Sequence, residues 1–128
     1  MYTTKSIGIW MDHVSAHLIE FRNLRVETVI FRAKIKEKHK YLQTKEETSD
    51  ENNQQQNYFK KIFEHIMPFE NILIFGPNEE KNQFEKYLRN QENFDGMKVV
   101  SLIADKMTDN HKHAYVNNYF KTIFSKKQ

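Results

Sequence analysis

The stretch Asn71-Ile-Leu-Ile-Phe-Gly-Pro77 decides the fold, because it is a short continuous apolar run closed by a Gly-Pro pair. Such a run is typical of a strand buried on both faces, as in a parallel sheet covered by helices. The segments on either side of it repeat apolar residues at helical spacing, at Tyr58, Phe59, Ile62, Phe63 and Ile66 before it and at Phe84, Tyr87 and Leu88 after it. A strand between two helices predicts βα units and parallel pairing.

The N-terminal part of the chain has the pattern of antiparallel strands. Residues 7–11 and 16–21 are short runs rich in β-branched and aromatic residues, and the turn-forming segment 12–15 separates them. A third strand is predicted over residues 26–35, where alternate positions lie on opposite faces. This part of the sequence therefore predicts a three-stranded meander.

The C-terminal part adds a strand and a helix. Residues 97–103 predict a fifth strand, and Thr108 is placed to cap a last helix that is apolar at Val116 and Phe120. Pro68 is expected to end the first helix, and Asn78 to cap the second. The predicted class is α/β, with a ribonuclease-H-like mixed five-stranded sheet in the order β-β-β-α-β-α-β-α.

The size and composition of the chain predict one domain with an aromatic core. The 128 residues suffice for one core, and 10 Phe, 6 Tyr and 1 Trp supply much of the apolar area. We expect a single domain over residues 1–128. A long polar loop is expected at about 36–53, where the sequence has no Gly, no Pro and almost no apolar side chain.

Charge and residue content exclude several classes of function. The net charge of +3 balances 20 Lys and Arg against 17 Asp and Glu, so the overall field predicts no particular polyanionic partner. Without Cys the chain has no disulfide, thiolate metal site or cysteine nucleophile. No apolar run approaches the roughly 20 residues that span a bilayer, and no signal peptide is evident, so we expect a cytoplasmic protein without a membrane partner.

A row of alternating basic residues is the strongest local feature of the charge pattern. This basic row consists of Arg32, Lys34, Lys36, Lys38 and Lys40. In an extended chain alternate residues lie about 6.6–6.8 Å apart, which is close to the spacing of phosphates along an extended nucleic-acid strand. The row therefore suggests RNA binding. The alternative is a solvated face that protects a strand edge, and the acidic run from Glu46 to Glu51 favours it.

Three segments resemble a known family: Ile7-Gly-Ile-Trp-Met-Asp-His13, Ile72-Leu-Ile-Phe-Gly-Pro77 with Lys81 four residues on, and Ala104-Asp-Lys-Met-Thr-Asp109. They are similar to small stand-alone bacterial proteins that resemble the middle domain of archaeal and eukaryotic class-1 peptide release factors and of the rescue factor Pelota. The resemblance runs over nearly the whole chain. It implies a ribonuclease-H-like fold of the translational machinery and a link to translation.

The same resemblance shows what is missing. In the release factors this domain has a Gly-Gly-Gln tripeptide between the third strand and the first helix, which enters the peptidyl-transferase centre and helps hydrolyse peptidyl-tRNA. The matching connection here, residues 36–53, contains no glycine. Gln43 within it, and Gln54, Gln55 and Gln56 after it, lack the neighbouring glycines that allow positive φ angles. The resemblance implies the fold without the catalysis.

Other catalytic and metal-binding patterns are incomplete. A nuclease site would need carboxylates on the first strand, the first helix and the end of the fourth strand; Asp12 and Glu64 fit the first two, but Phe75-Gly-Pro77 offers none. Asp12 is expected to cap the hairpin turn instead. The turn from Gly76 to Lys81 lacks the P-loop pattern, so simple helix capping is expected there.

The six histidines do not predict a metal site. Asp12, His13 and His17 lie near the first hairpin, whereas Asp109, His111 and His113 belong to the last helix. Two helical positions two residues apart point in nearly opposite directions, so His111 and His113 are unsuited to shared ligation. No catalytic residue, metal site or cofactor is predicted.

The function that best fits the sequence is a non-catalytic RNA- or ribosome-associated binding module that uses the basic row. The first alternative is catalytic, either a peptidyl-tRNA hydrolase using the glutamines or a degenerate nuclease using Asp12. The second is a protein-interaction or self-assembling domain, which exposed aromatic residues such as Trp10, Tyr115 or Phe124 would favour. The sequence leaves the oligomeric state open.

Overall fold

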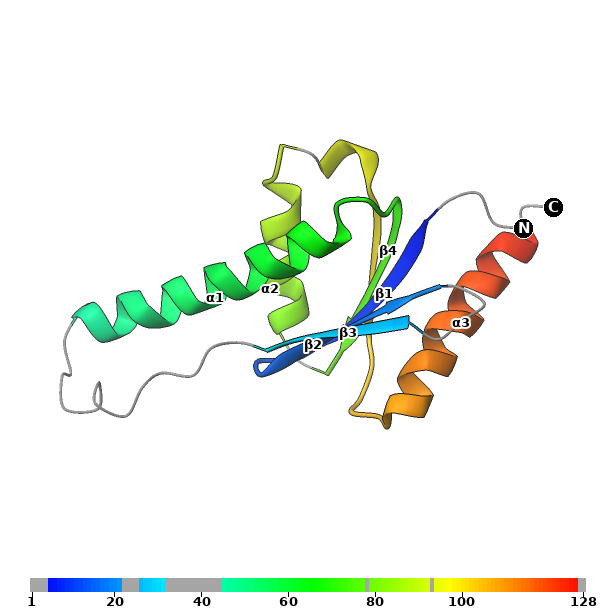
Figure 1. Cartoon of the computed structure of the whole chain (residues 1–128), viewed down its shortest axis with the longest axis horizontal. Coiled ribbons are helices and arrows are strands. Elements are labelled where there is room, and N and C mark those ends of the chain that lie inside the picture. Colours follow the sequence, from blue (N-terminus) through cyan, green and yellow to red (C-terminus); the bar gives the residue numbers. More distant parts are fainter. Residues whose placement is uncertain (1–4, 22–25, 32–44, 78, 93, 127–128) are drawn as a thin grey trace.

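A computed structural model describes residues 5–21, 26–31, 45–77, 79–92 and 94–126. They form one mixed sheet with helices on both faces (Figure 1). The strands are β1 (Ser6–Met11), β2 (Ser15–Glu20), β3 (Val26–Phe31), β4 (Asn71–Gly76) and β5 (Lys98–Ile103). The helices are α1 (Lys45–Ile66), α2 (Glu80–Arg89), the short 3₁₀ helix η2 (Phe94–Gly96) and α3 (Asp109–Lys126).

The sheet has the strand order β3-β2-β1-β4-β5. Strands β1, β2 and β3 pair antiparallel, as successive strands separated by only a few residues do. Strand β1 also pairs parallel with β4, and β4 with β5, because a helix crosses over between the strands of each pair. The predicted meander followed by βα units is confirmed, and so is the ribonuclease-H-like order of elements.

Two hydrophobic layers hold the helices on the sheet. Helices α1 and α2 cover one face and α3 covers the other (Figure 1). On the α1 side the buried side chains include Ile7, Ile9, Leu18, Phe59 and Phe84; on the α3 side they include Trp10, Ile19, Phe75, Val116 and Phe120. The alternation of residues along β1 and β2 sends neighbours to opposite layers, as strand geometry requires.

Aromatic rings make up much of both layers, as the composition predicts. Phe59 contacts the rings of Phe84 and Tyr87 at centroid distances of 5.3 and 5.6 Å on one side. On the other side Phe75 stacks on Tyr115 at 4.6 Å. Among the described helices, none combines the length and the hydrophobicity that a membrane span requires.

The polar stretch between the third strand and the first helix differs from its prediction. The loop expected to reach Asn53 is already helical from Lys45. Residues 45–53 lack the apolar periodicity that marks an amphipathic helix, but they contain no Gly or Pro and are rich in Glu, which has good helix propensity. Residues 36–44 of the expected loop, and residues 32–35 of the expected third strand, lie outside the described part of the chain.

The helix ends follow the predictions except at α2. Helix α1 ends at Ile66, two residues before Pro68, and the backbone N–H of His111 donates to the Thr108 side-chain oxygen at 3.2 Å, as expected of a cap. Helix α2 begins at Glu80, and its N-cap position falls on Glu79, which makes no side-chain cap. The predicted cap at Asn78 is therefore one residue early.

Candidate nucleic-acid interface

A groove lies between the end of strand β3 and the outer side of helix α1. Its volume is about 310 Å³, and it is lined by Phe31, Gln54, Asn57, Tyr58, Lys60, Lys61 and Glu64. Apart from Phe31 and Tyr58 these side chains are polar or charged. The groove can therefore offer hydrogen bonds and positive charge to a ligand.

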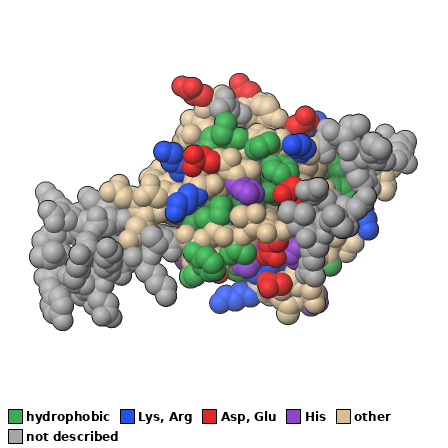
Figure 2. Space-filling view, viewed as in Figure 1, with side chains coloured by type: hydrophobic (Ala, Val, Ile, Leu, Met, Phe, Trp, Pro, Cys, Tyr) green, Lys and Arg blue, Asp and Glu red, His purple; other side chains and the backbone are tan. Residues whose placement is uncertain are grey.

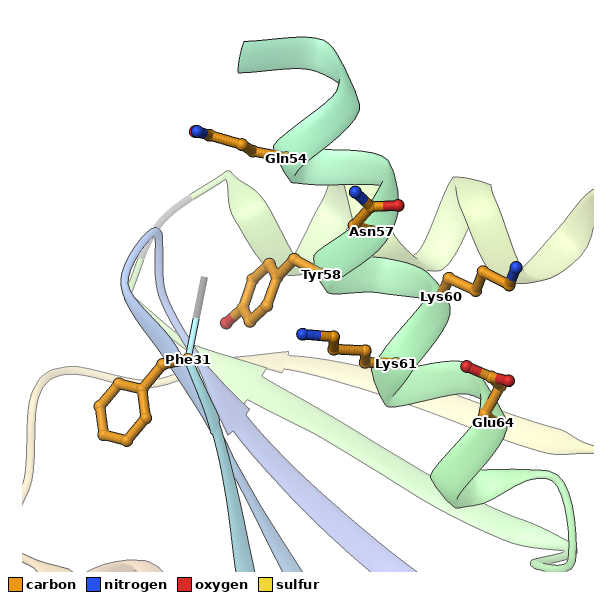
Figure 3. A pocket seen from close by; sticks show the side chains of 7 residues that line it. All are labelled: Phe31, Gln54, Asn57, Tyr58, Lys60, Lys61 and Glu64. Carbon is orange, nitrogen blue, oxygen red and sulfur yellow. The ribbon is translucent and has the colours of Figure 1, made fainter. Parts of the chain in front are cut away.

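The side chains of the groove leave α1 in different directions. Figure 3 shows Tyr58 and Lys61 extending from the helix toward β3, while Lys60 extends away from it. The ring of Phe31 points away from the helix in the same view, and it is 66% exposed. An exposed aromatic ring at the end of a strand and two lysines on the adjacent helix are suited to a polar, anionic partner with flat groups.

One hydrogen bond fixes this part of α1 to the sheet. The buried Tyr58 donates its hydroxyl to the backbone carbonyl of Asp12 at 3.1 Å. Asp12 in turn accepts the backbone N–H groups of Val14 and Ser15 at 2.8 and 3.0 Å through its carboxylate. The predicted role of Asp12 as the cap of the hairpin turn is confirmed, and the same turn anchors the helix.

The basic row itself lies outside the described residues, because Arg32, Lys34, Lys36, Lys38 and Lys40 all fall within 32–44. Phe31 is the last residue described before the row and lines the groove. The row is therefore continuous in sequence with the groove. Within β3, Ile30 packs against the layer that contains α1, whereas Glu27 contacts residues on the α3 side, so the predicted alternation of faces is observed there.

The described charges on the visible face of the molecule are mixed. Figure 2 shows Lys and Arg side chains interspersed with Asp and Glu over the sheet and helices. This mixture agrees with the near balance of 20 basic and 17 acidic residues. Local geometry at the groove therefore matters more than the overall field.

Among the described residues, those considered for catalysis have structural roles or lie on separate elements. The Asp12 carboxylate is occupied by the turn, and Glu64 lies on α1 at the groove. Gln54, Gln55 and Gln56 belong to helix α1 rather than to a loop, and Gln55 donates to Gln83 of α2. Gln43 lies outside the described residues.

The turn before α2 holds two buried charged side chains. The Glu80 carboxylate is 1% exposed and pairs with the His13 ring nitrogen Nδ1 at 2.8 Å. Lys81 is also buried and donates to Asn82 and Ser101 at 2.8 and 3.5 Å. Lys81 thus donates to side chains of the protein itself. The helix capping expected for this turn is not observed as a side-chain cap, because the N-cap residue Glu79 makes no such hydrogen bond.

A second polar cluster lies between the sheet and α3. Glu27 of β3 accepts hydrogen bonds from His17 of β2 at 2.7 Å and from His113 of α3 at 2.9 Å. Partial burial raises the pKa of Glu27, but hydrogen bonds and charge interactions with His113 and His17 outweigh it and hold the pKa below its ordinary value. The sequence did not predict this cluster.

The aromatic residues that would have favoured a binding surface are part of the core. Trp10 is buried, Tyr115 stacks on Phe75, and Phe124 stacks on Phe21 at 5.8 Å. Each ring joins the layer under α3. These three positions therefore do not form an exposed aromatic surface.

Comparison with solved structures identifies the fold. The structure of Pelota from Archaeoglobus fulgidus superposes with a TM-score of 0.60 over 95% of this chain, at 11% sequence identity. Pelota from Thermoplasma acidophilum gives a TM-score of 0.52 over 85% of the chain, at 18% identity. The chain shares its fold with part of Pelota. The resemblance suggested by the sequence segments is thus confirmed at the level of the fold.

The match covers only part of each Pelota chain. The chain corresponds to 35% and 30% of the two Pelota chains, or about a third of their length. At 11% and 18% identity the likeness establishes the fold alone. No protein-family model matches the sequence, and no curated protein is significantly similar to it.

Proposed function

We propose that this chain is a non-catalytic module that binds RNA or the ribosome through the groove and the basic row together. The supporting observation is the groove itself, because Lys60 and Lys61 line it together with Phe31, the last described residue before the basic row. Phosphate groups are the natural partners of such lysines, and base faces are natural partners of an exposed ring such as Phe31.

The fold adds support from a second direction. The chain shares its fold with part of Pelota, and the sequence segments resemble release-factor middle domains, which implies a link to translation. The glutamines that would have to replace the Gly-Gly-Gln tripeptide lie on helix α1, or outside the described residues in the case of Gln43. A binding role therefore fits the chain better than peptidyl-tRNA hydrolysis.

Charge reversal in the groove tests this proposal. The double variant Lys60→Glu/Lys61→Glu is expected to weaken binding to a labelled single-stranded RNA, or co-sedimentation with purified ribosomes, by at least about tenfold. Both lysines are exposed, so the variant is expected to fold. Reversal of the five positions of the basic row should have the same or a larger effect.

A matched control separates the groove from the overall charge. Lys86→Glu/Lys121→Glu makes the same change in net charge at exposed positions of α2 and α3. This control is expected to bind nearly as well as the wild type. Equal losses of binding in both double variants, or no binding by the wild type at low salt, would refute the proposed interface. Release of product from peptidyl-tRNA or RNA would refute the non-catalytic role.

The position of β5 at the end of the sheet favours a second candidate, a self-assembling domain. Strand β5 is the last in the sheet order, and its Ile103 is 83% exposed. Among the described strands none pairs with the outer edge of β5, and such an edge with apolar side chains can add a strand from another chain. Light scattering over a range of protein concentrations tests this candidate, since self-assembly raises the measured mass with concentration.

A further inference from the structure

The cluster around Glu27 brings metal-binding groups together from three elements. His17 comes from β2, Glu27 from β3, and Asp109 and His113 from the first turns of α3. One ring nitrogen of His17 and one carboxylate oxygen each of Glu27 and Asp109 all lie within 4.8 Å of one another. Residues distant in the sequence thus place three possible ligand atoms around one point.

We propose that His17, Glu27 and Asp109 bind a zinc ion. Imidazole nitrogen and carboxylate oxygen are ligands that zinc prefers, and sites with three protein ligands keep a fourth position for water. Ligand atoms around tetrahedral zinc lie about 3.3 Å apart, given bonds of about 2.0–2.1 Å. The three ligand atoms lie within 4.8 Å of one another, so the site needs side-chain rotation to bring them to this spacing.

His113 acts as a positioning residue in this site. Its Nε2 bonds to one oxygen of Glu27 at 2.9 Å, while the other oxygen of Glu27 faces His17 at 2.7 Å. Carboxylates that ligate metals are usually held by such an additional hydrogen bond. His113 also follows Asp109 by four residues, so both lie on the same side of α3.

The two ends of the cluster differ in exposure. The side chains of His17 and His113 are largely buried, whereas that of Asp109 is 68% exposed. Water and metal therefore have access from the Asp109 side. The buried imidazoles fix the inner part of the site before the ion arrives, which lowers the ordering cost of binding.

Lys112 competes for one ligand. Its ammonium lies 3.6 Å from an oxygen of Asp109 and 3.9 Å from the centre of the Trp10 ring. A carboxylate has two oxygens, so Asp109 can accept Lys112 with one and ligate the ion with the other. The contact with the Trp10 ring gives the ammonium a second favourable partner.

Trp10 also provides a specific readout. It is the single tryptophan, and its ring centre lies 5.8 Å from that of His17. Protein stripped with a chelator and then desalted is titrated with zinc chloride, while calorimetry measures stoichiometry and affinity. We expect one zinc ion per chain and a saturable change in tryptophan emission at the same zinc concentration.

Two ligand variants and one control complete the experiment. Asp109→Asn removes an exposed ligand while leaving the hydrogen bonds of Glu27 intact, and His17→Ala removes the buried ligand. Each should weaken zinc binding by at least about tenfold. His111→Ala removes an exposed histidine from the same helix and is expected to bind zinc like the wild type.

The outcomes distinguish a site from a hydrogen-bonded cluster. Absence of stoichiometric zinc binding by the wild type, or equal losses in His111→Ala and Asp109→Asn, would overturn the proposal. An equal response to magnesium would overturn the assignment to a metal that prefers imidazole. Because the measurement involves no RNA, its result is independent of the proposed RNA interface.

Discussion

Gly76 lies where strand β4 approaches the backbone of β1 so closely that no side chain fits between them. A Cβ atom added there would collide with the carbonyl oxygen of Met11, which cannot rotate away as a side chain could. Gly76→Ala should therefore lower the free energy of unfolding by about 1–3 kcal/mol through overpacking. Urea denaturation followed by circular dichroism measures the change.

Gly96 provides the control for this substitution. A Cβ atom at Gly96 meets no other atom within 4 Å, and its φ angle is not positive. Gly96→Ala is expected to leave stability unchanged or to raise it by about 0.4–1 kcal/mol, because the unfolded chain loses freedom. A larger loss at Gly96 than at Gly76 would contradict the explanation by close approach.

Single residues were predictable from the sequence where their partners are local. Asp12 and Thr108 bond to backbone groups two or three positions away, and the spacing alone indicates such bonds. Glu27 was missed because its partners lie on another strand and on a helix. The strand register places His17 opposite Val29, so Glu27 is a diagonal neighbour, and this relation requires the pairing to be known.

Helix α1 is attached to the rest of the fold through the apolar side that contains Phe59. Phe59 is buried and contacts the rings of Phe84 and Tyr87, while the adjacent Lys60 is exposed. Phe59→Ala should cost about 3–5 kcal/mol of stability, because it leaves a cavity between α1 and α2. Lys60→Ala, the neighbouring control, is expected to change stability by less than about 0.5 kcal/mol in the same denaturation experiment.

The elements differ in how much of each could be predicted. The apolar spacing predicts the buried half of α1 correctly, whereas the polar composition of its first turns predicts a loop. The spacing of apolar residues shows which side of a helix is buried. It gives no signal where a helix extends beyond the sheet, as α1 does in Figure 1. Intrinsic propensity was the remaining signal in that polar stretch.

At the scale of the molecule, the small net charge makes the proposed RNA binding depend on a few contacts. Each phosphate contact on single-stranded RNA contributes about 0.7 to the slope of log affinity against log salt. Replacing Lys60 and Lys61 by alanine should therefore reduce the magnitude of the slope by about 1.4. Fluorescence anisotropy at several salt concentrations measures it, and an unchanged slope would exclude these lysines as phosphate contacts.

The architecture as a whole was predictable because short turns and helical crossovers leave few arrangements. The run at Asn71–Gly76 proved to be the central parallel strand β4, between β1 and β5. The proposed interface was less predictable, because the basic row lies outside the described residues and the groove needs α1 and β3 in place. A groove formed between two elements leaves no recognisable pattern in the sequence of either element.

The pairing of β1 with β4 also constrains how the chain is made. Strands β1 to β3 are near neighbours in sequence, but Ser6 pairs with Asn71, which is past the midpoint of the 128 residues. Contacts between distant residues form slowly, since the loop between them must close first. During synthesis the N-terminal meander therefore emerges with one hydrogen-bonding edge of β1 unpaired, and the core is completed only when β4 has been made and pairs with that edge.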